Sequence, residues 1–436
     1  MAKKICVIGV GYVGLITAVG LSDFGNTVVG VDVDEEKVKS LNQGQSIIYE
    51  PGLEEYLHRN ISSGRLRFST DVGSAIKESD VVFVAVGTPS LDNGDADLSY
   101  LYTVVEDVVK HAVHNTVLVI KSTVPVGTNR TVSDYLLSKG KSNISVVSNP
   151  EFLREGKAVY DFFHPDRVII GCNNPVAKEM MEDVYRALNR TVVPFVWCDW
   201  ESAELIKYAS NGFLAMKVAY INQIACLAEE AGADINIIAR AMGMDGRIGS
   251  KFLHAGPGFG GSCFPKDIRA LSKIGKKYGS PISLIDCVIG ANENQKLHIF
   301  KKIKKRLENM QGKTVGILGL AFKAETDDIR ESPAIVIVEL LQKAGSVIKA
   351  HDPKAMANFK KLFPSVQYVD SEYDVAEGAD ALIILTEWNE YRSLDLEKIK
   401  RLMKTPYIFD TRKVIDEDSL KQFGFLYDVV GKKTQS

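Results

Sequence analysis

The chain has 436 residues, a length at which two or three domains are expected. Its hydrophobic fraction of 45% and charged fraction of 25% are ordinary for a globular protein that buries a sizeable core. Lysine and arginine number 53 and aspartate and glutamate 55, so the formal net charge is −2. This balance provides no basic surface for nucleic acid and no polybasic face for a membrane. An anionic ligand must therefore be held by a few local cations.

Membrane insertion and disulfide bonding are not expected from this sequence. No stretch approaches the roughly 20 consecutive apolar residues of a membrane-spanning helix. The apolar start of the chain is broken by spaced glycines and has no clear cleavage site, which argues against a signal peptide. The six cysteines form no Cys-x-x-Cys pair and no zinc-like cluster. We therefore expect reduced thiols, a cytoplasmic protein and no metal site.

Residues 3 to about 198 alternate between short β-branched runs and segments of helical spacing, as in βαβ units. The runs that predict parallel strands are 5–8, 27–31, 81–86, 117–120, 144–147 and 168–170. From Asp199 the apolar residues recur every three or four positions, which predicts one amphipathic helix of about thirty residues that ends at Gly232. Its apolar stripe consists of Leu205, Ala209, Phe213, Met216, Tyr220, Ile224 and Leu227.

More helical sequence continues to about residue 309 and is interrupted by a glycine-rich stretch at 256–262. The strand pattern then resumes at 313–320, 347–350, 381–385 and 407–409. We therefore expect an α/β protein with two parallel sheets and a helical middle. The predicted domains are residues 1–198, 199–310 and 311–436.

A glycine motif, Gly9-Val-Gly11-Tyr-Val-Gly14, directly follows the first predicted strand and opens a helix. Gly9 permits a tight turn, Gly11 lets a pyrophosphate approach the backbone, and Gly14 lets the helix pack on the strand. Asp32 follows the second strand, where a carboxylate accepts hydrogen bonds from a ribose diol and repels a 2′-phosphate. The pattern predicts binding of NAD rather than NADP. Lys37 could face an adenosine phosphate or be a solvated helix residue.

Cys263 lies in the stretch Gly260-Gly-Ser-Cys-Phe-Pro-Lys266-Asp267. The glycines would allow close approach of a substrate, and Lys266 would favour a thiolate. If a helix begins near Cys263, Asp267 lies one turn on and reaches a water near the sulfur. A thiolate adds to an aldehyde to give a thiohemiacetal, which can lose hydride to form a thioester. A small buried side chain in a tight loop is the alternative, and the other five cysteines are expected in the core.

Three further polar residues are candidates for the chemistry. Lys207 and Asn211 are spaced i, i+4 on the long helix, so both could donate to a developing oxyanion. An exposed polar face is the ordinary alternative. Glu151, in the stretch 149–156, follows a strand end, where ligands of open α/β sheets bind. It could act as a base or be a solvated loop carboxylate.

Taken together, the motifs resemble those of the UDP-glucose 6-dehydrogenase family of nucleotide-sugar dehydrogenases. The matching segments are GVGYVGL at 9–15, VGTP at 86–89, KSTVPVGT at 121–128, NPEFLREG at 149–156, GPGFGGSCFPKD at 256–267 and GLAFKAETDDIRESP at 319–333. The resemblance implies two Rossmann-like domains joined by a long helix, which also forms a homodimer core. The first domain would bind NAD and the second the UDP part of the substrate.

The implied reaction is the four-electron oxidation of a sugar C6 alcohol to a carboxylate, with two NAD and one water. The cysteine segment fits members that act on UDP-glucose and form UDP-glucuronate, a precursor in polysaccharide biosynthesis. By motif match, Cys263 would carry the thioester. The remaining chemical roles are oxyanion donors at Lys207 and Asn211, water-ordering groups at Asp267 and Thr123, and a base at Glu151.

The resemblance also implies binding residues. The implied cofactor contacts are Gly9, Gly11, Tyr12, Val13, Gly14, Asp32, Lys37, Thr88, Pro89, Thr123, Glu155, Lys266 and Arg330. The implied substrate contacts are Glu151, Phe152, Leu153, Arg154, Glu155, Lys207, Asn211, Phe252, Leu253, His254, Ala255, Gly256, Gly260, Phe322, Lys323 and Arg412. Arg247 would reach into the site of the partner subunit.

Three alternatives remain open. The nearest is the same chemistry on GDP-mannose or a UDP-N-acetylhexosamine. A two-electron dehydrogenase of hydroxyacids or hydroxyacyl thioesters would explain the first glycine motif, but not the later α/β region or the Cys263 stretch. A non-catalytic dinucleotide-binding module would leave Lys207 and Cys263 without a purpose.

Overall fold

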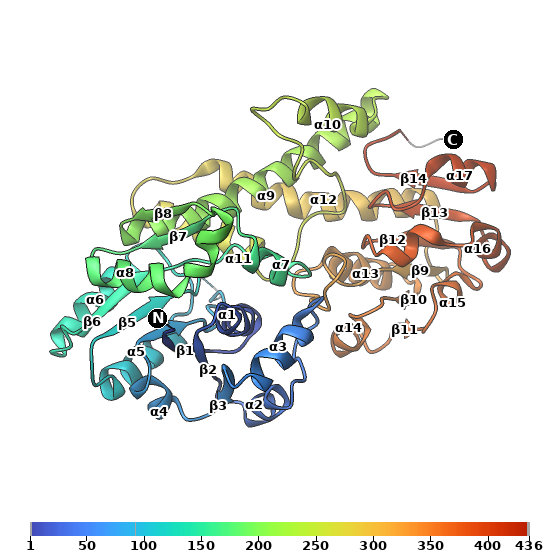
Figure 1. Cartoon of the computed structure of the whole chain (residues 1–436). Coiled ribbons are helices and arrows are strands. Elements are labelled where there is room, and N and C mark those ends of the chain that lie inside the picture. Colours follow the sequence, from blue (N-terminus) through green and yellow to red (C-terminus); the bar gives the residue numbers. More distant parts are fainter. Residues whose placement is uncertain (1, 92, 434–436) are drawn as a thin grey trace. The chain divides into compact units, whose positions relative to one another are not determined.

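The computed structural model describes residues 2–91 and 93–433 (Figure 1). The chain forms two compact units, residues 1–210 and 211–436. Within the described part of the chain, none of the helices combines the length and the apolarity that a membrane span requires.

The N-terminal unit is built on one sheet with the strand order β3-β2-β1-β4-β5-β6-β7-β8. All neighbouring strands run parallel except the pair β6–β7. The strands are β1 (Lys4–Ile8), β2 (Thr27–Val31), β3 (Leu66–Ser69), β4 (Val81–Val84), β5 (Thr116–Ile120), β6 (Ile144–Ser148), β7 (Val168–Gly171) and β8 (Phe195–Cys198). The reversal of strand order between β1 and β4 is the point at which open α/β sheets bind ligands.

Helices cover both faces of this sheet, because successive strand residues point to opposite sides. They are α1 (Tyr12–Asp23), α2 (Glu35–Asn42), α3 (Leu53–Ser62), α4 (Val72–Lys77), α5 (Ser99–His111), α6 (Thr128–Ser138), α7 (Ala158–Phe163), α8 (Pro175–Val184) and the short η1 (Arg186–Thr191). Ile5 and Val7 belong to one buried core with side chains of α1, α3, α7 and α8. Cys6 and Ile8 belong to the other, with α4, α5 and α6.

The long helix α9 (Trp200–Ala231) has 32 residues, and Gly232 follows it with a φ of 74°. The predicted helix and its end are therefore confirmed. Its orientation differs from that of an ordinary surface helix, because much of the apolar stripe points outward in the single chain. The exposed members are Leu205, Ala209, Phe213, Tyr220 and Leu227. Polar groups, including Lys207 and Asn211, lie on the buried face instead.

The C-terminal unit begins within α9 and continues through α10 (Ile235–Gly243), α11 (Phe264–Lys277) and α12 (Ser283–Leu307). Its parallel sheet has the order β11-β10-β9-β12-β13-β14. The strands are β9 (Thr314–Leu318), β10 (Val347–His351), β11 (Gln367–Tyr368), β12 (Ala381–Ile384), β13 (Tyr407–Asp410) and β14 (Leu426–Val429). The helices are α13 (Pro333–Lys343), α14 (Met356–Leu362), α15 (Glu372–Ala376), η2 (Asn389–Ser393), α16 (Leu396–Leu402) and α17 (Glu417–Gln422).

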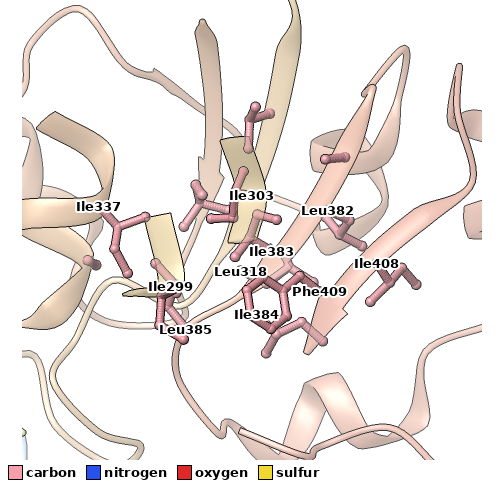
Figure 2. Close-up of a cluster of buried hydrophobic side chains, with 14 of the residues drawn as sticks. Ile299, Ile303, Leu318, Ile337, Leu382, Ile383, Ile384, Leu385, Ile408 and Phe409 are labelled. Carbon is pink, nitrogen blue, oxygen red and sulfur yellow. The ribbon is translucent and has the colours of Figure 1, made fainter. Parts of the chain in front are cut away.

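The core of this unit joins α12 to the sheet. Ile299 and Ile303 of α12 belong to one buried cluster with Leu318, Ile383 and Phe409 from three neighbouring strands (Figure 2). These side chains are all fully buried. The strand order β3-β2-β1-β4-β5-β6 of the first sheet is therefore repeated by the six strands of the second. The predicted α/β fold with two parallel sheets and a long central helix is confirmed.

Four strands were not predicted: β3, β8, β11 and β14. They are the edge strands of the two sheets. Edge strands lack a neighbour on one side, so they do not need the continuous apolar run of a central parallel strand. The expectation that every cysteine other than Cys263 lies in the core is also wrong. Cys287 on α12 is exposed, and only Cys6 is fully buried.

Candidate active site

The turn between β1 and α1 has the geometry of a phosphate-binding turn. Gly9 has a φ of 87°, and a Cβ on Gly14 would lie 1.7 Å from the Gly9 carbonyl oxygen. Gly11 stands at the N-cap of α1 and has no side chain to cap the first amides of the helix. A Cβ on Gly11 would meet nothing within 4 Å. The turn therefore leaves open space at a helix N-terminus, which fits the pyrophosphate of a dinucleotide.

Asp32 lies beside this turn at the carboxyl end of β2. One carboxylate oxygen accepts a hydrogen bond from the Val10 amide at 3.1 Å, and the other accepts from the Asp34 amide at 3.2 Å. The Nζ of Lys37 lies 4.0 Å from Asp32 and 3.8 Å from Asp34, and the lysine side chain is 43% exposed. Lys37 is thus a half-exposed partner of the acid that would bind the ribose, so the structure leaves both interpretations of Lys37 open.

The carboxyl ends of β4 and β5 bring two predicted cofactor residues together. The Thr88 hydroxyl donates to the Thr123 carbonyl oxygen at 2.8 Å. Tyr12 and Val13 begin α1, and Pro89 follows Thr88 on the surface. Because β1, β4 and β5 are parallel neighbours, these segments share one edge of the sheet.

Glu151 and Lys207 form a buried ion pair in the N-terminal unit. The Lys207 ammonium donates to a Glu151 carboxylate oxygen at 2.7 Å, and the side chains are only 4% and 6% exposed. The other oxygen accepts from the Leu153 amide at 2.6 Å. Burial opposes ionisation of Glu151, but the charge and hydrogen bond of Lys207 outweigh it and hold the pKa of the carboxyl below its ordinary value. The two ordinary alternatives, a solvated loop carboxylate and an exposed polar helix face, are therefore wrong.

The loop that follows Glu151 is fixed by a residue that the sequence analysis missed. The buried carboxylate of Glu50 accepts hydrogen bonds from the amides of Gly156 and Ala158, each at 2.7 Å. The hydroxyl of Tyr12 also bonds to Glu50. Glu50 therefore ties the glycine turn to the predicted substrate loop. Within that loop, Arg154 pairs with Asp161 at 2.5 Å.

In the C-terminal unit, Cys263 is the N-cap of α11, and the Asp267 amide donates to the Cys263 carbonyl oxygen at 2.9 Å. The predicted spacing of one helical turn is therefore present. The dipole of α11 favours negative charge at its N-terminus, where the sulfur lies. The Ser262 hydroxyl is 3.5 Å from that sulfur.

Asp267 is buried and holds two predicted site residues. One carboxylate oxygen accepts from the Asn211 amide at 2.6 Å, and the other from the Lys266 ammonium at 2.7 Å. Asn211 is on the buried face of α9. Asp267 thus orients the Asn211 carboxamide and the Lys266 ammonium next to the Cys263 turn. Asn211 is therefore not part of an exposed polar helix face.

The glycines before Cys263 make room for the protein itself. A Cβ on Gly260 would lie 2.3 Å from the Glu331 carbonyl oxygen, and a Cβ on Gly261 would lie 2.8 Å from the Phe322 ring. On the side where a Cβ would stand, these glycines therefore make room for the chain, and close approach of a substrate to their backbone stays a prediction. Packing of the stretch against the 319–333 segment explains why both motifs occur together.

Arg412 connects the carboxyl ends of three strands in the C-terminal sheet. Its guanidinium donates to the carbonyl oxygens of Leu385 at 2.8 Å and Phe322 at 3.1 Å, and lies 3.2 Å from the Glu387 carboxylate. A Cβ on Gly256 would lie 3.4 Å from this guanidinium. The structure therefore brings Gly256, Phe322 and Arg412 together at the edge where ligands of such sheets bind.

Further predicted residues lie on loops. The Lys323 ammonium is 5.3 Å from the Phe322 ring centroid, and Arg330 pairs with Asp328 at 2.7 Å. Arg247 pairs with Asp245 at 2.6 Å on an exposed loop. In the predicted substrate loop 252–256, Leu253 is buried and His254 is exposed.

Three successive segments of the chain match models of one protein family. Residues 3–189 match the NAD binding domain of the UDP-glucose/GDP-mannose dehydrogenase family, residues 201–294 its central domain and residues 316–417 its UDP binding domain. The chain belongs to this family. The predicted resemblance and the predicted cofactor, NAD, are therefore confirmed at the level of the family.

Relatives match from end to end. A UDP-glucose 6-dehydrogenase of Rhizobium meliloti is 46% identical, over 98% of this chain and 99% of that protein. The UDP-glucose 6-dehydrogenase TuaD of Bacillus subtilis is 43% identical, over 99% of this chain and 93% of that protein. The structure of a UDP-glucose dehydrogenase from Pyrobaculum islandicum is similar with a TM-score of 0.92 and 38% identity, over 99% of this chain and 98% of that one. A UDP-D-ManNAc dehydrogenase from Pyrococcus horikoshii has a TM-score of 0.86 and 28% identity, over 99% and 100%.

The three matched segments divide the site in a consistent way. The glycine turn, Asp32 and Glu151 lie in the NAD binding segment of this dehydrogenase family. Cys263 and its neighbours lie in the central segment, and Arg412 lies in the UDP binding segment.

Proposed function

We propose that this dehydrogenase oxidises UDP-glucose to UDP-glucuronate, consuming two NAD and one water and forming two NADH. The observation that carries the proposal is Cys263 at the N-terminus of α11, with the buried Asp267 one turn on, in a chain matched from end to end by UDP-glucose 6-dehydrogenases. Two structures of dehydrogenases named for UDP-N-acetylmannosamine are less similar, at 28% and 26% identity. This difference favours glucose over the N-acetylated alternatives.

NAD would lie on the β1–α1 turn, with its pyrophosphate at Gly11 and a ribose at Asp32. When bound, it accepts hydride from the sugar carbon. The open space at Gly11 and the accessible carboxylate of Asp32 support this placement. Thr88 and Thr123, whose loops are joined by a hydrogen bond, would line the same edge of the sheet.

In the first oxidation, C6 loses a hydride and its hydroxyl loses a proton to the buried Glu151–Lys207 pair, which leaves an aldehyde. A free aldehyde cannot give a second hydride until a nucleophile adds. The Cys263 thiolate would form a bond to C6, and the resulting oxyanion would be stabilised by Lys207 and Asn211.

In the second oxidation, loss of hydride from the thiohemiacetal carbon leaves a thioester on Cys263. Water ordered by Asp267 and Thr123 would add to the thioester carbonyl, with Glu151 taking its proton. The carbon–sulfur bond then breaks, the carboxylate is released and the thiolate is restored. Glu151 releases its first proton to solvent before it takes the proton of the water. The overall reaction then balances with one water taken up, two hydrides transferred and three protons released.

The UDP part would bind in the C-terminal unit. Arg412 and Lys323 are cations that follow strands at the carboxyl edge of that sheet, and such side chains can hold a diphosphate despite a net charge of −2. The backbone of the 252–256 loop and of Gly260 would complete the contacts with substrate. Glu155, Lys266 and Arg330 would contribute to the cofactor side.

The active form would be a cytoplasmic homodimer that pairs through α9. Phe213, Tyr220 and Leu227 recur every seven residues and are exposed, which gives one continuous apolar strip on the helix. Burial of this strip against a second copy explains its composition, and Arg247 would extend into the partner's site. Light scattering of Phe213→Asp should then report monomers where the unaltered chain gives dimers.

The test of the function is the ratio of NADH formed to nucleotide sugar consumed. UDP-glucose should give a ratio of two, whereas a two-electron enzyme gives one and a binding module gives none. GDP-mannose and UDP-N-acetylhexosamines, tested in parallel, decide the substrate. Cys263→Ser should fail to form the acid while the exposed-cysteine control Cys287→Ser behaves normally. Normal acid formation by Cys263→Ser would exclude the thioester route.

A further inference from the structure

A second buried lysine lies near the Glu151–Lys207 pair. Lys121 directly follows β5, is only 5% exposed and donates from its ammonium to the Asn149 side-chain oxygen at 3.2 Å. The same oxygen accepts from the Tyr185 hydroxyl at 2.7 Å, and the Asn149 amide group donates to the Ile169 carbonyl oxygen at 2.8 Å. Asn149 is thus held on both sides, and it fixes the position of the Lys121 ammonium.

Lys121 has a neutral partner for its hydrogen bond, although it is a cation in a buried place. Among the described residues, no carboxylate lies within 4.0 Å of its ammonium. The charged groups whose fields reach it are Glu151 and Lys207. Burial lowers the pKa of Lys121 to about 8, and the positive charge of Lys207 adds to this effect while Glu151 opposes it.

The three groups together carry one more positive than negative charge when all are ionised. In the structure Lys207 supplies the hydrogen bond to Glu151. If Lys207 moves its hydrogen bond to a reacting oxygen, the buried Glu151 carboxylate keeps the Leu153 amide but loses its charged partner, which is costly. Lys121 is the other cation whose charge favours the ionised form of Glu151.

We propose that Lys121 is a positioning residue of the active site: its ammonium, fixed by Asn149 two residues before Glu151, keeps the Glu151 carboxylate ionised while Lys207 bonds the reacting oxygen of the sugar. The inference rests on the proposed function. It assigns a purpose to a lysine that the sequence analysis passed over in the motif at 121–128. It also explains why Asn149 is held so firmly two residues before Glu151.

The pH dependence of the first turnover tests this role. The rate of the unaltered protein should fall as pH rises through about 8, because Lys121 then loses its charge. Lys121→Met should be about tenfold slower near neutral pH and should lack this alkaline decline. The acid limb should move up by about one pH unit, because loss of a nearby positive charge raises the pKa of Glu151. Lys121→Arg should retain the rate and keep it to higher pH.

The control is Lys141→Met, since Lys141 bonds only to the Ala112 carbonyl oxygen among its described partners. Its rate and pH profile should be unchanged. Thermal unfolding of each variant separates a folding defect from a change in chemistry. A Lys121→Met profile that coincides with that of the unaltered protein would overturn the inference.

A second measurement does not depend on turnover. Infrared spectra of protein with ¹³C-labelled glutamate carboxyl groups, compared with Glu151→Gln, follow the titration of Glu151 directly. Its pKa should be higher in Lys121→Met than in the unaltered protein, and equal values would also overturn the inference. If the unaltered protein forms no NADH from UDP-glucose, the proposed function fails, while this titration still decides the role of Lys121.

Discussion

The two sheets each begin with a strand that runs into a glycine turn, but the two turns leave different groups accessible. In the N-terminal unit β1 leads into the segment 9–14, and in the C-terminal unit β9 leads into the segment 319–324. Gly9 and Gly319 occupy equivalent places and have φ values of 87° and 95°. Where the first turn has Gly11 and Gly14, the second has alanines at 321 and 324. The first turn alone keeps the bare backbone that a pyrophosphate needs.

Asp32 follows β2 and Asp352 follows β10, and these two acids also differ in how accessible their oxygens are. Asp352 is fully buried, and its oxygens accept hydrogen bonds from five donors: the amides of Leu320, Ala321, Lys354 and Ala355 and the indole of Trp388. Asp32 accepts from two backbone amides, and its side chain is 12% exposed. One sequence pattern therefore places a fully buried, turn-stabilising acid in the C-terminal unit and a partly exposed acid in the N-terminal unit.

The largest effect on stability should come from removal of the Asp352 carboxylate. Asp352→Ala leaves several buried donors without an acceptor, so the C-terminal unit should lose about 4 kcal/mol or more of its free energy of unfolding. Calorimetry should show a large drop in the unfolding temperature of that unit. Asp352→Asn, which keeps part of the network, should fall in between. A change below about 1 kcal/mol would show that the five bonds do not stabilise the turn.

Removal of the Asp32 carboxylate should change NAD binding rather than stability. Asp32→Ala should weaken NAD binding by about 1.5–3 kcal/mol, because a charged hydrogen-bond acceptor for the ribose is lost. It should also reduce the preference for NAD over NADP, since the repelling charge is gone. Titration calorimetry with both dinucleotides measures these changes. Thermal stability should change little, and a loss as large as that of Asp352→Ala would contradict the proposed contrast.

A single methyl group at Gly11 offers a smaller and more local test. The Cβ of Gly11→Ala meets no atom of the chain within 4 Å, so the fold should tolerate it. If the pyrophosphate lies there, NAD affinity should fall by about tenfold, or 1.4 kcal/mol. The reciprocal change Ala321→Gly should not create dinucleotide binding in the C-terminal unit, because Asp352 has no accessible oxygen. Unchanged NAD affinity in Gly11→Ala would place the dinucleotide elsewhere.

The central strands were predictable because a parallel strand that is buried on both faces must be apolar along its length. The edge strands were not, since β3 alternates between buried and exposed residues and β11 has only two residues. Exposure of much of the α9 apolar stripe could not be predicted from the sequence pattern either. A helical period shows that one face is apolar, but not whether that face meets the same chain or another copy.

The site was predictable where a motif needs particular residue types at short spacing, as with Cys263 and Asp267 one turn apart. Sequence could not show that Lys207 pairs with Glu151 and Asn211 with Asp267, because these partners are distant in the chain. Glu50 and Lys121 were missed for the same reason. A lone acid in a loop and a lysine after a strand become significant only when the fold buries them beside other charges.

The smallest predicted effect is a pH dependence of the free energy of unfolding that arises in the C-terminal unit. His298 on α12 bonds to Glu229 at 2.9 Å, and its hydrogen bonds with Cys226 and Glu229 raise its pKa from 6.5 to about 9. A raised pKa stabilises the fold below the unfolded value of 6.5, and that stability is lost as pH rises through about 9. Because the ring is partly exposed, we expect a loss of about 1 kcal/mol in the C-terminal unit. His298→Gln should remove this pH dependence, whereas His114→Gln in the N-terminal unit should not. Parallel calorimetric slopes between pH 6.5 and 9 for the unaltered protein and His298→Gln would show that the imidazolium contributes nothing there.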